Sequence, residues 1–143
     1  MSIMAFQRFT RKTAALTRDP VVGIQKRGTF SMNASAVQIL RATRDLGIDE
    51  EVVVEFLYDP ESQTVGLQIA EDPLEGYEVR KQPNSESYLV SGRSFTQYYK
   101  LDTSVARRYR AAERNNMLVI DLKRPLGQSS PGRPRAGDLF STR

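Results

Sequence analysis

Residues 51–69, EVVVEFLYDPESQTVGLQI, contain two apolar stretches separated by a short polar segment. The first stretch, residues 51–58, and the second, residues 64–69, are rich in β-branched and apolar side chains, which favour extended strands. The intervening DPESQ contains Asp, Pro and Ser, which are typical turn formers. The sequence therefore predicts a β-hairpin at this place in the chain.

A strand, a glycine corner and a short helix are predicted before this hairpin. Residues 21–24 (VVGI) lead into residues 26–28 (KRG), and residues 29–32 (TFSM) then alternate polar and apolar side chains. This pattern indicates a strand that is broken or bulged at the glycine. Asn33 is a good N-cap for a helix over residues 34–43, ASAVQILRAT, which has apolar residues on one face.

The same order of patterns recurs downstream. YLVSG at residues 88–92 aligns with FSMNA at residues 30–34 at an offset of 58, and the hairpin pattern recurs at an offset of 53. Repetition of this kind is typical of a duplicated structural unit. We therefore predict a mainly β (α+β) fold of two tandem β-α-β-β units, residues 20–73 and 74–122, which form a pseudo-dimeric β core.

Basic arms are predicted at both ends of this core. Residues 1–19 hold four Lys and Arg, and residues 123–143 concentrate Pro, Gly, Ser and Arg with little to bury, which predicts a disordered tail. The composition of the first arm also suits an organelle transit peptide. No apolar run approaches the roughly 18 residues of a membrane span, so we expect a cytoplasmic protein without a membrane partner.

The composition of the 143 residues argues against most enzymes. The chain has no cysteine and no histidine, which excludes disulfides, thiolate zinc sites, thiol nucleophiles and serine-histidine triads. The carboxylates show no calcium-loop spacing, and Asp72 and Glu75 have no histidine or lysine nearby to set their protonation. We therefore expect no catalysis, no cofactor and no metal.

Charges are separated along the chain into blocks of alternating sign. Residues 1–44 carry eight Lys and Arg with one acid, residues 45–78 carry eleven acids and no cation, and residues 79–143 carry thirteen cations with five acids. Basic blocks of this kind favour an anionic partner, while the acidic block should face away from it or bind a basic segment.

Residues 20–69 resemble the AbrB and SpoVT family of swapped-hairpin DNA-binding modules. Lys26-Arg27-Gly28 matches the family's basic glycine corner, and LGI at residues 46–48 matches its helix exit. The chain departs from the family pattern at two places. It has Asn33 where the family has proline, and it has Val37 and Gln38 where the family has basic residues. The resemblance implies interleaved hairpins and duplex DNA binding by a bacterial, archaeal or phage regulator or nucleoid-associated protein, with a homodimer or higher oligomer as one arrangement.

Ten cations are candidates for contacts with nucleic-acid phosphates, although each one is also compatible with an ordinary solvated surface charge. A second hypothesis is single-strand binding, because five aromatic residues between positions 88 and 109 lie among basic ones; the alternative is that Phe95 and Tyr98 belong to the core. A third hypothesis is a protein-interaction or assembly module without nucleic acid. The ten candidates are Lys26, Arg27, Arg41, Arg44, Arg80, Lys81, Arg93, Arg107, Arg108 and Arg110.

Overall fold

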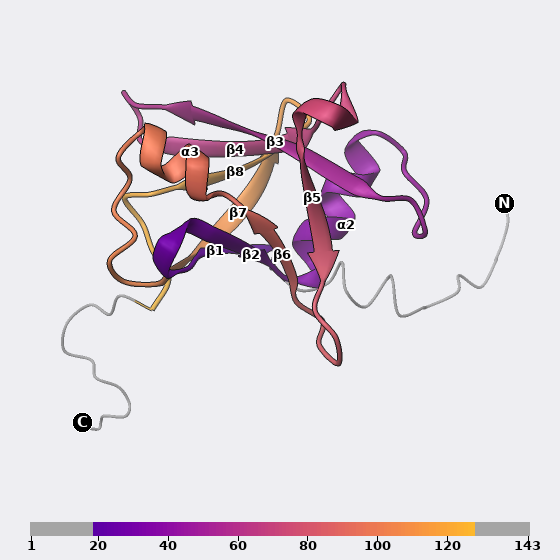
Figure 1. The fold of residues 1–143 in the computed structure, drawn as a ribbon, viewed down its shortest axis with the longest axis horizontal. Helices are drawn as coiled ribbons and strands as arrows, with labels where there is room; N and C mark the ends of the chain where they lie inside the picture. Colours follow the sequence, from indigo (N-terminus) through magenta and orange to yellow (C-terminus); the bar gives the residue numbers. More distant parts are fainter. Residues whose placement is uncertain (1–18, 128–143) are drawn as a thin grey trace, which may run out of the picture.

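Eight antiparallel strands form one closed barrel (Figure 1) in the computed structural model, which describes residues 19–127. The order around the barrel is β1-β2-β6-β5-β3-β4-β8-β7. The two halves of the chain occupy equivalent places in this order. β1, the first strand of one half, lies between β2 and β7, and β5, the first strand of the other half, lies between β6 and β3. Closure pairs every strand on both sides, so no sheet edge is left open.

The first half of the described chain contributes β1 (Val21–Ile24), the 3-10 turn η1 (Lys26–Gly28), β2 (Thr29–Met32), the helix α2 (Ala34–Thr43), β3 (Val52–Asp59) and β4 (Thr64–Ile69). The second half contributes the 3-10 turn η2 (Pro73–Glu75), β5 (Tyr77–Lys81), β6 (Tyr88–Ser91), the helix α3 (Arg93–Tyr98), β7 (Arg107–Arg114) and β8 (Met117–Asp121).

The predicted fold of two tandem β-α-β-β units with a pseudo-dimeric core is wrong. Each half of the chain supplies four strands, because β1 and β2 are separate strands on either side of Gly28 and because β5 precedes β6. These strands alternate in pairs around a single closed sheet, so residues 20–73 and 74–122 share one core. The swapped-hairpin arrangement that the AbrB resemblance implied is likewise at odds with this barrel.

Two local predictions in the first half are confirmed. The helix spans Ala34–Thr43, and the Asn33 Oδ1 accepts hydrogen bonds from the backbone N–H of Ala36 at 2.9 Å and of Val21 at 3.1 Å. One side chain therefore caps α2 and ties it to the start of β1. The hairpin joins β3 to β4 through a turn in which Asp59 accepts hydrogen bonds from Ser62 and Glu61, and these bonds lower the pKa of the Asp59 carboxyl.

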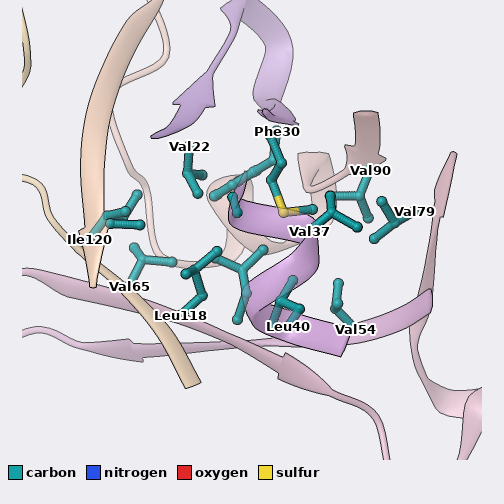
Figure 2. Close-up of a cluster of buried hydrophobic side chains, with 14 of the residues drawn as sticks. Val22, Phe30, Val37, Leu40, Val54, Val65, Val79, Val90, Leu118 and Ile120 are labelled. Carbon is teal, nitrogen blue, oxygen red and sulfur yellow. The ribbon is translucent and has the colours of Figure 1, made fainter. Parts of the chain in front are cut away.

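The core fills the inside of the barrel with aliphatic and aromatic side chains. Figure 2 shows Val37 and Leu40 of α2 beside strand residues such as Val54 and Leu118, and all four are buried. Inward and outward residues alternate along the strands, as in β4, where Val65, Leu67 and Ile69 are buried. The helices lie at opposite ends of the barrel in Figure 1.

An aromatic cluster closes the α3 end. Phe95 is buried, and its ring lies 5.0 Å from that of Phe56, 6.2 Å from that of Phe30 and 5.3 Å from that of Tyr99. The prediction that Phe95 is a core residue is therefore confirmed. The same prediction for Tyr98 is wrong, because its side chain is 78% exposed.

The predicted arms fall mostly outside the described residues, since the structure describes neither residues 1–18 nor residues 128–143. The start of the second arm lies against the barrel. The backbone N–H of Leu126 donates to the Arg108 carbonyl at 2.7 Å, and the Lys123 ammonium donates to the Ser62 carbonyl at 2.7 Å. Within residues 19–127, neither helix is long and apolar enough to cross a membrane.

Candidate nucleic-acid interface

The glycine corner between β1 and β2 is a tight turn that exposes two cations. The backbone N–H of Gly28 donates to the Gln25 carbonyl at 3.0 Å, and that of Gln25 donates to the Thr29 carbonyl at 2.8 Å. Arg27 has a φ of 73° and Gly28 a φ of 93°, both in the left-handed region. Glycine adopts this conformation without steric cost, so Gly28 allows the chain to reverse here while Lys26 and Arg27 remain in solvent.

Gly28 also packs directly against the start of α3. The backbone N–H of Gly92 donates to the Gly28 carbonyl at 3.1 Å. A Cβ atom at Gly28 would lie 2.9 Å from the Arg93 Cα and 2.5 Å from the Thr96 Oγ1, so only a glycine fits between them. Figure 1 shows the indigo turn between β1 and β2 beside α3. Arg93 is thereby placed next to a corner that lies more than sixty residues earlier in the chain.

Lys26, Arg27 and Arg93 form what we call the basic corner. All three side chains are exposed, and none has an ion-pair partner among residues 19–127. These three cations are hydrated and can bind an anionic ligand, since no described carboxylate pairs with them. The corner therefore presents three exposed cations that no carboxylate among residues 19–127 neutralises.

The arginines of β7 extend the positive surface along β1. Arg108 and Arg110 point outward from the barrel and lie opposite Gly23 and Val21 of β1. A Cβ atom at Gly23 would lie 3.4 Å from the Arg108 Cγ, so the stem of Arg108 lies close over this glycine. Arg108 has no ion pair in the described part of the chain. Arg110 lies 3.1 Å from Asp19, but both side chains are largely exposed, and such a pair contributes little.

A row of outward-facing positions connects β7 to β5 across the sheet. Arg108 is opposite Gly23, Gly23 opposite Ser31, Ser31 opposite Leu89 and Leu89 opposite Arg80. Arg108 and Arg80 thus lie at the two ends of a row of mostly small side chains. At the usual strand spacing these two arginines are about 19 Å apart across the sheet. Arg80 lies 3.2 Å from the exposed Glu78, and the Lys81 ammonium donates to the Ser85 carbonyl.

Arg107 is held differently from its two neighbours on β7. Its side chain is only 29% exposed and lies 3.5 Å from Asp102. Arg107 therefore belongs to the α3 end of the barrel, and we do not include it in the outward-facing row.

Two of the candidate cations lie away from this surface. Arg41 and Arg44 are at the end of α2, and α2 lies at the opposite end of the barrel from α3 (Figure 1). The Arg41 Nη1 donates to the carbonyls of Gly47 at 2.8 Å and Glu50 at 2.7 Å. Arg41 thus stabilises the loop that follows α2, whereas Arg44 is an exposed residue without an ion pair in the described region.

These two arginines give a stability prediction. Arg41→Met should lower the free energy of unfolding by about 1–2 kcal/mol, because two loop carbonyls lose a charged donor. Arg44→Met should change it by less than about 0.5 kcal/mol, as is usual for an exposed residue without specific contacts. Urea unfolding followed by circular dichroism measures both. Equal stability of the two variants would contradict the loop-bracing role of Arg41.

Most of the acidic block is spread over segments on another side of the molecule; the exception is Glu78 on β5, which lies 3.2 Å from Arg80. The other carboxylates lie in the α2–β3 loop, along β3, in the β3–β4 turn and around η2. In Figure 1 the β3–β4 turn and η2 are at the top of the view, whereas β1 and β2 run along the bottom. No group of three or more acidic side chains within residues 19–127 is arranged to hold a metal ion.

No known protein family, curated protein or solved structure matches this chain. Sequence patterns predicted that Lys26 and Arg27 lie at an exposed strand corner, but they gave no reason to place Arg93 beside this corner. They placed Lys100 among aromatic residues but gave no reason to place Lys123 near it at the α3 end of the barrel.

Proposed function

We propose that this protein binds nucleic acid, with double-stranded DNA as the preferred form, through the basic corner and the adjoining outer face of β1. The observation that carries this proposal is the convergence of Lys26, Arg27 and Arg93. Three exposed cations from two distant parts of the chain lie together, and no described carboxylate neutralises them.

The chemistry of the surface suits a phosphate backbone. Lysine and arginine that neutralise phosphates release condensed counterions, and this release supplies most of the sequence-independent affinity for DNA. Gly28 and Gly23 are buried, and they let the corner pack on α3 and the Arg108 stem lie over β1, which fixes where these cations stand. Arg108 and Arg80 would then contact phosphates on either side of the row across β1, β2 and β6.

The biological role that follows is that of a transcriptional regulator or a nucleoid-associated protein of a bacterium, an archaeon or a phage. The corner sequence KRG resembles that of AbrB-like proteins, but the barrel lacks their swapped hairpins, so this role rests on the phosphate-binding surface and not on the resemblance. Binding through phosphates requires neither a cofactor nor a catalytic residue, in keeping with a chain that has no histidine or cysteine.

The decisive test removes the two charges of the corner. Lys26→Ala combined with Arg27→Ala should flatten the dependence of duplex affinity on salt by about 1.8 units of log-log slope, because each phosphate contact contributes about 0.9. Electrophoretic mobility shift at several salt concentrations measures the slope. The fold should be retained, since both residues are exposed.

A matched control removes the same charge elsewhere. Arg44→Ala with Arg114→Ala also lowers the net charge by two, but both residues are exposed and outside the basic corner. This variant should keep the slope of the parent protein. If both double variants lose slope equally, net charge and not the basic corner determines binding, and our assignment of the surface is wrong.

Single-strand binding is a second candidate, and one observation favours it. Tyr98 is 78% exposed, its ring lies 4.8 Å from that of Tyr99, and Lys100 follows directly. Exposed aromatic rings beside a cation are suited to stacking unpaired bases. Competition between duplex and single-stranded probes distinguishes the two candidates, and Tyr98→Ala should weaken binding only to the single strand. A protein-interaction module would show no salt-dependent retention of either probe.

A further inference from the structure

A pocket of about 420 Å³ opens at the α3 end of the barrel, between the end of β1, the start of β7 and the segments that follow α3 and β8. Its volume lies in the range of ~300–1,000 Å³ that is typical of small-molecule sites. None of its lining residues belongs to the basic corner. Its polar and aromatic lining includes Tyr58, Tyr99, Lys100, Asp102, Arg107, Tyr109 and Lys123.

The charges that line the pocket are predominantly positive. Lys100, Arg107 and Lys123 are cations, and Asp102 is the single carboxylate in the lining. The Asp102 carboxylate accepts hydrogen bonds from the hydroxyl of Ser104 at 2.6 Å and from its backbone N–H at 2.9 Å, and these bonds lower its pKa. Asp102 is therefore ionised at neutral pH and offsets one cation, the adjacent Arg107 at 3.5 Å. Lys123 lies near a carboxylate outside the lining, Asp121, so Lys100 is the lining cation that has no ion pair within the described residues.

The two lysines differ in how they are held. Lys123 is fixed by its hydrogen bond to the Ser62 carbonyl and lies 3.7 Å from Asp121. An ammonium group has three donors, so Lys123 retains capacity for a ligand. Lys100 has no ion-pair partner within the described residues, and its φ of 56° places it in the left-handed region at the end of α3. This is the usual left-handed geometry after a helix end, in which the N–H of Leu101 donates to the Thr96 carbonyl at 2.9 Å.

Tyrosine rings form the other part of the lining. The Tyr99 side chain is 42% exposed, and its ring centre lies 5.0 Å from that of Tyr58. Tyr109 is buried, and this burial raises the pKa of its phenol, which therefore remains protonated and able to donate a hydrogen bond. The pocket thus offers an accessible aromatic face together with cationic donors.

We propose that this pocket binds a nucleoside monophosphate. Lys100, Arg107 and Lys123 would bind the phosphate, because charge-assisted hydrogen bonds to phosphate oxygens are the strongest contacts that such side chains make. The partly exposed ring of Tyr99 would stack on the base, as tyrosines do in nucleotide recognition. This proposal is independent of the proposed duplex surface, since those two sets of residues do not overlap, whereas the single-strand candidate shares Tyr99 and Lys100 with the pocket.

Isothermal titration of the full chain with adenosine monophosphate, adenosine and inorganic phosphate tests the proposal. Adenosine monophosphate should bind at least about tenfold more tightly than either fragment, because only it engages both the cations and the ring. Lys100→Gly removes one charge and relieves the left-handed backbone, and it should weaken binding of adenosine monophosphate about tenfold. Tyr99→Leu should weaken binding of adenosine monophosphate and leave that of phosphate unchanged.

The Lys26→Ala, Arg27→Ala variant serves as the control, and it should bind adenosine monophosphate as the parent protein does. Failure of duplex binding therefore leaves this proposal standing, and the reverse is also true. The proposal is overturned if the parent protein does not bind adenosine monophosphate or binds inorganic phosphate as tightly. Equal binding by the parent, Lys100→Gly and Tyr99→Leu proteins also overturns it, because the ligand would then lie elsewhere.

Discussion

Phe30→Ala is expected to lower the free energy of unfolding by about 3–5 kcal/mol, the usual cost of removing a fully buried phenylalanine. The Phe30 side chain is 0% exposed, and its ring lies 4.9 Å from the ring of Phe56 and 6.2 Å from that of Phe95. It also packs on Gly92, where a Cβ atom would lie only 2.4 Å from the ring. Loss of the ring leaves a cavity between β2, β3 and α3 that neighbouring backbone cannot fill.

Chemical unfolding in urea measures this loss, and an exposed aromatic residue supplies the control. Tyr98→Ala should lower stability by less than about 1 kcal/mol, because Tyr98 makes one edge contact, with Tyr99. A loss of under about 1 kcal/mol for Phe30→Ala would contradict the placement of this ring at the centre of the aromatic cluster.

Local elements could be predicted because short-range chemistry determines them. Asn33 is a strong N-cap, and α2 begins at the next residue. The turn formers in DPESQ lie between two β-rich stretches, and β3 and β4 pair across them. In both cases the residues that decide the structure are within a few positions of one another.

The barrel could not be predicted because its closure depends on pairings between distant strands. β1 pairs with β7, and β2 pairs with β6, yet neither pairing leaves a signal in the local pattern. β5 was missed for a different reason. Its sequence YEVRK buries only Val79, so it lacks the alternation that identifies a strand.

Some residues of the candidate site could be recognised from the sequence, and others could not, for the same reason. Lys26 and Arg27 could be recognised because they precede a glycine at a strand corner, whereas the position of Arg93 depends on the close approach of α3 to Gly28. The role of Arg41 depends on loop carbonyls whose direction no sequence pattern specifies. Tyr98 shares the helical spacing of Phe95, but α3 has six residues and ends at Tyr98, where the ring remains exposed.

Gly28→Ala should both destabilise the barrel and weaken DNA binding without removing any charge. The φ of +93° is unfavourable for alanine, and its Cβ would lie 2.5 Å from the Thr96 Oγ1 and 2.9 Å from the Arg93 Cα. Backbone strain of about 1–3 kcal/mol is then combined with overpacking of similar size. We expect a total loss of more than about 2 kcal/mol, measured by urea unfolding.

The matched control is Gly127→Ala, because Gly127 has a φ of +74° with nothing within 4 Å of the added Cβ. This variant carries the backbone strain alone, so the difference between the two variants reports the close packing of the corner on α3. Since α3 must shift to accommodate the alanine, Arg93 moves away from Lys26 and Arg27, and the salt slope of duplex binding should fall by up to about 0.9, one phosphate contact. A Gly28→Ala protein that is destabilised but still folded, and that keeps the parent slope, would show that Arg93 does not act together with the other two cations.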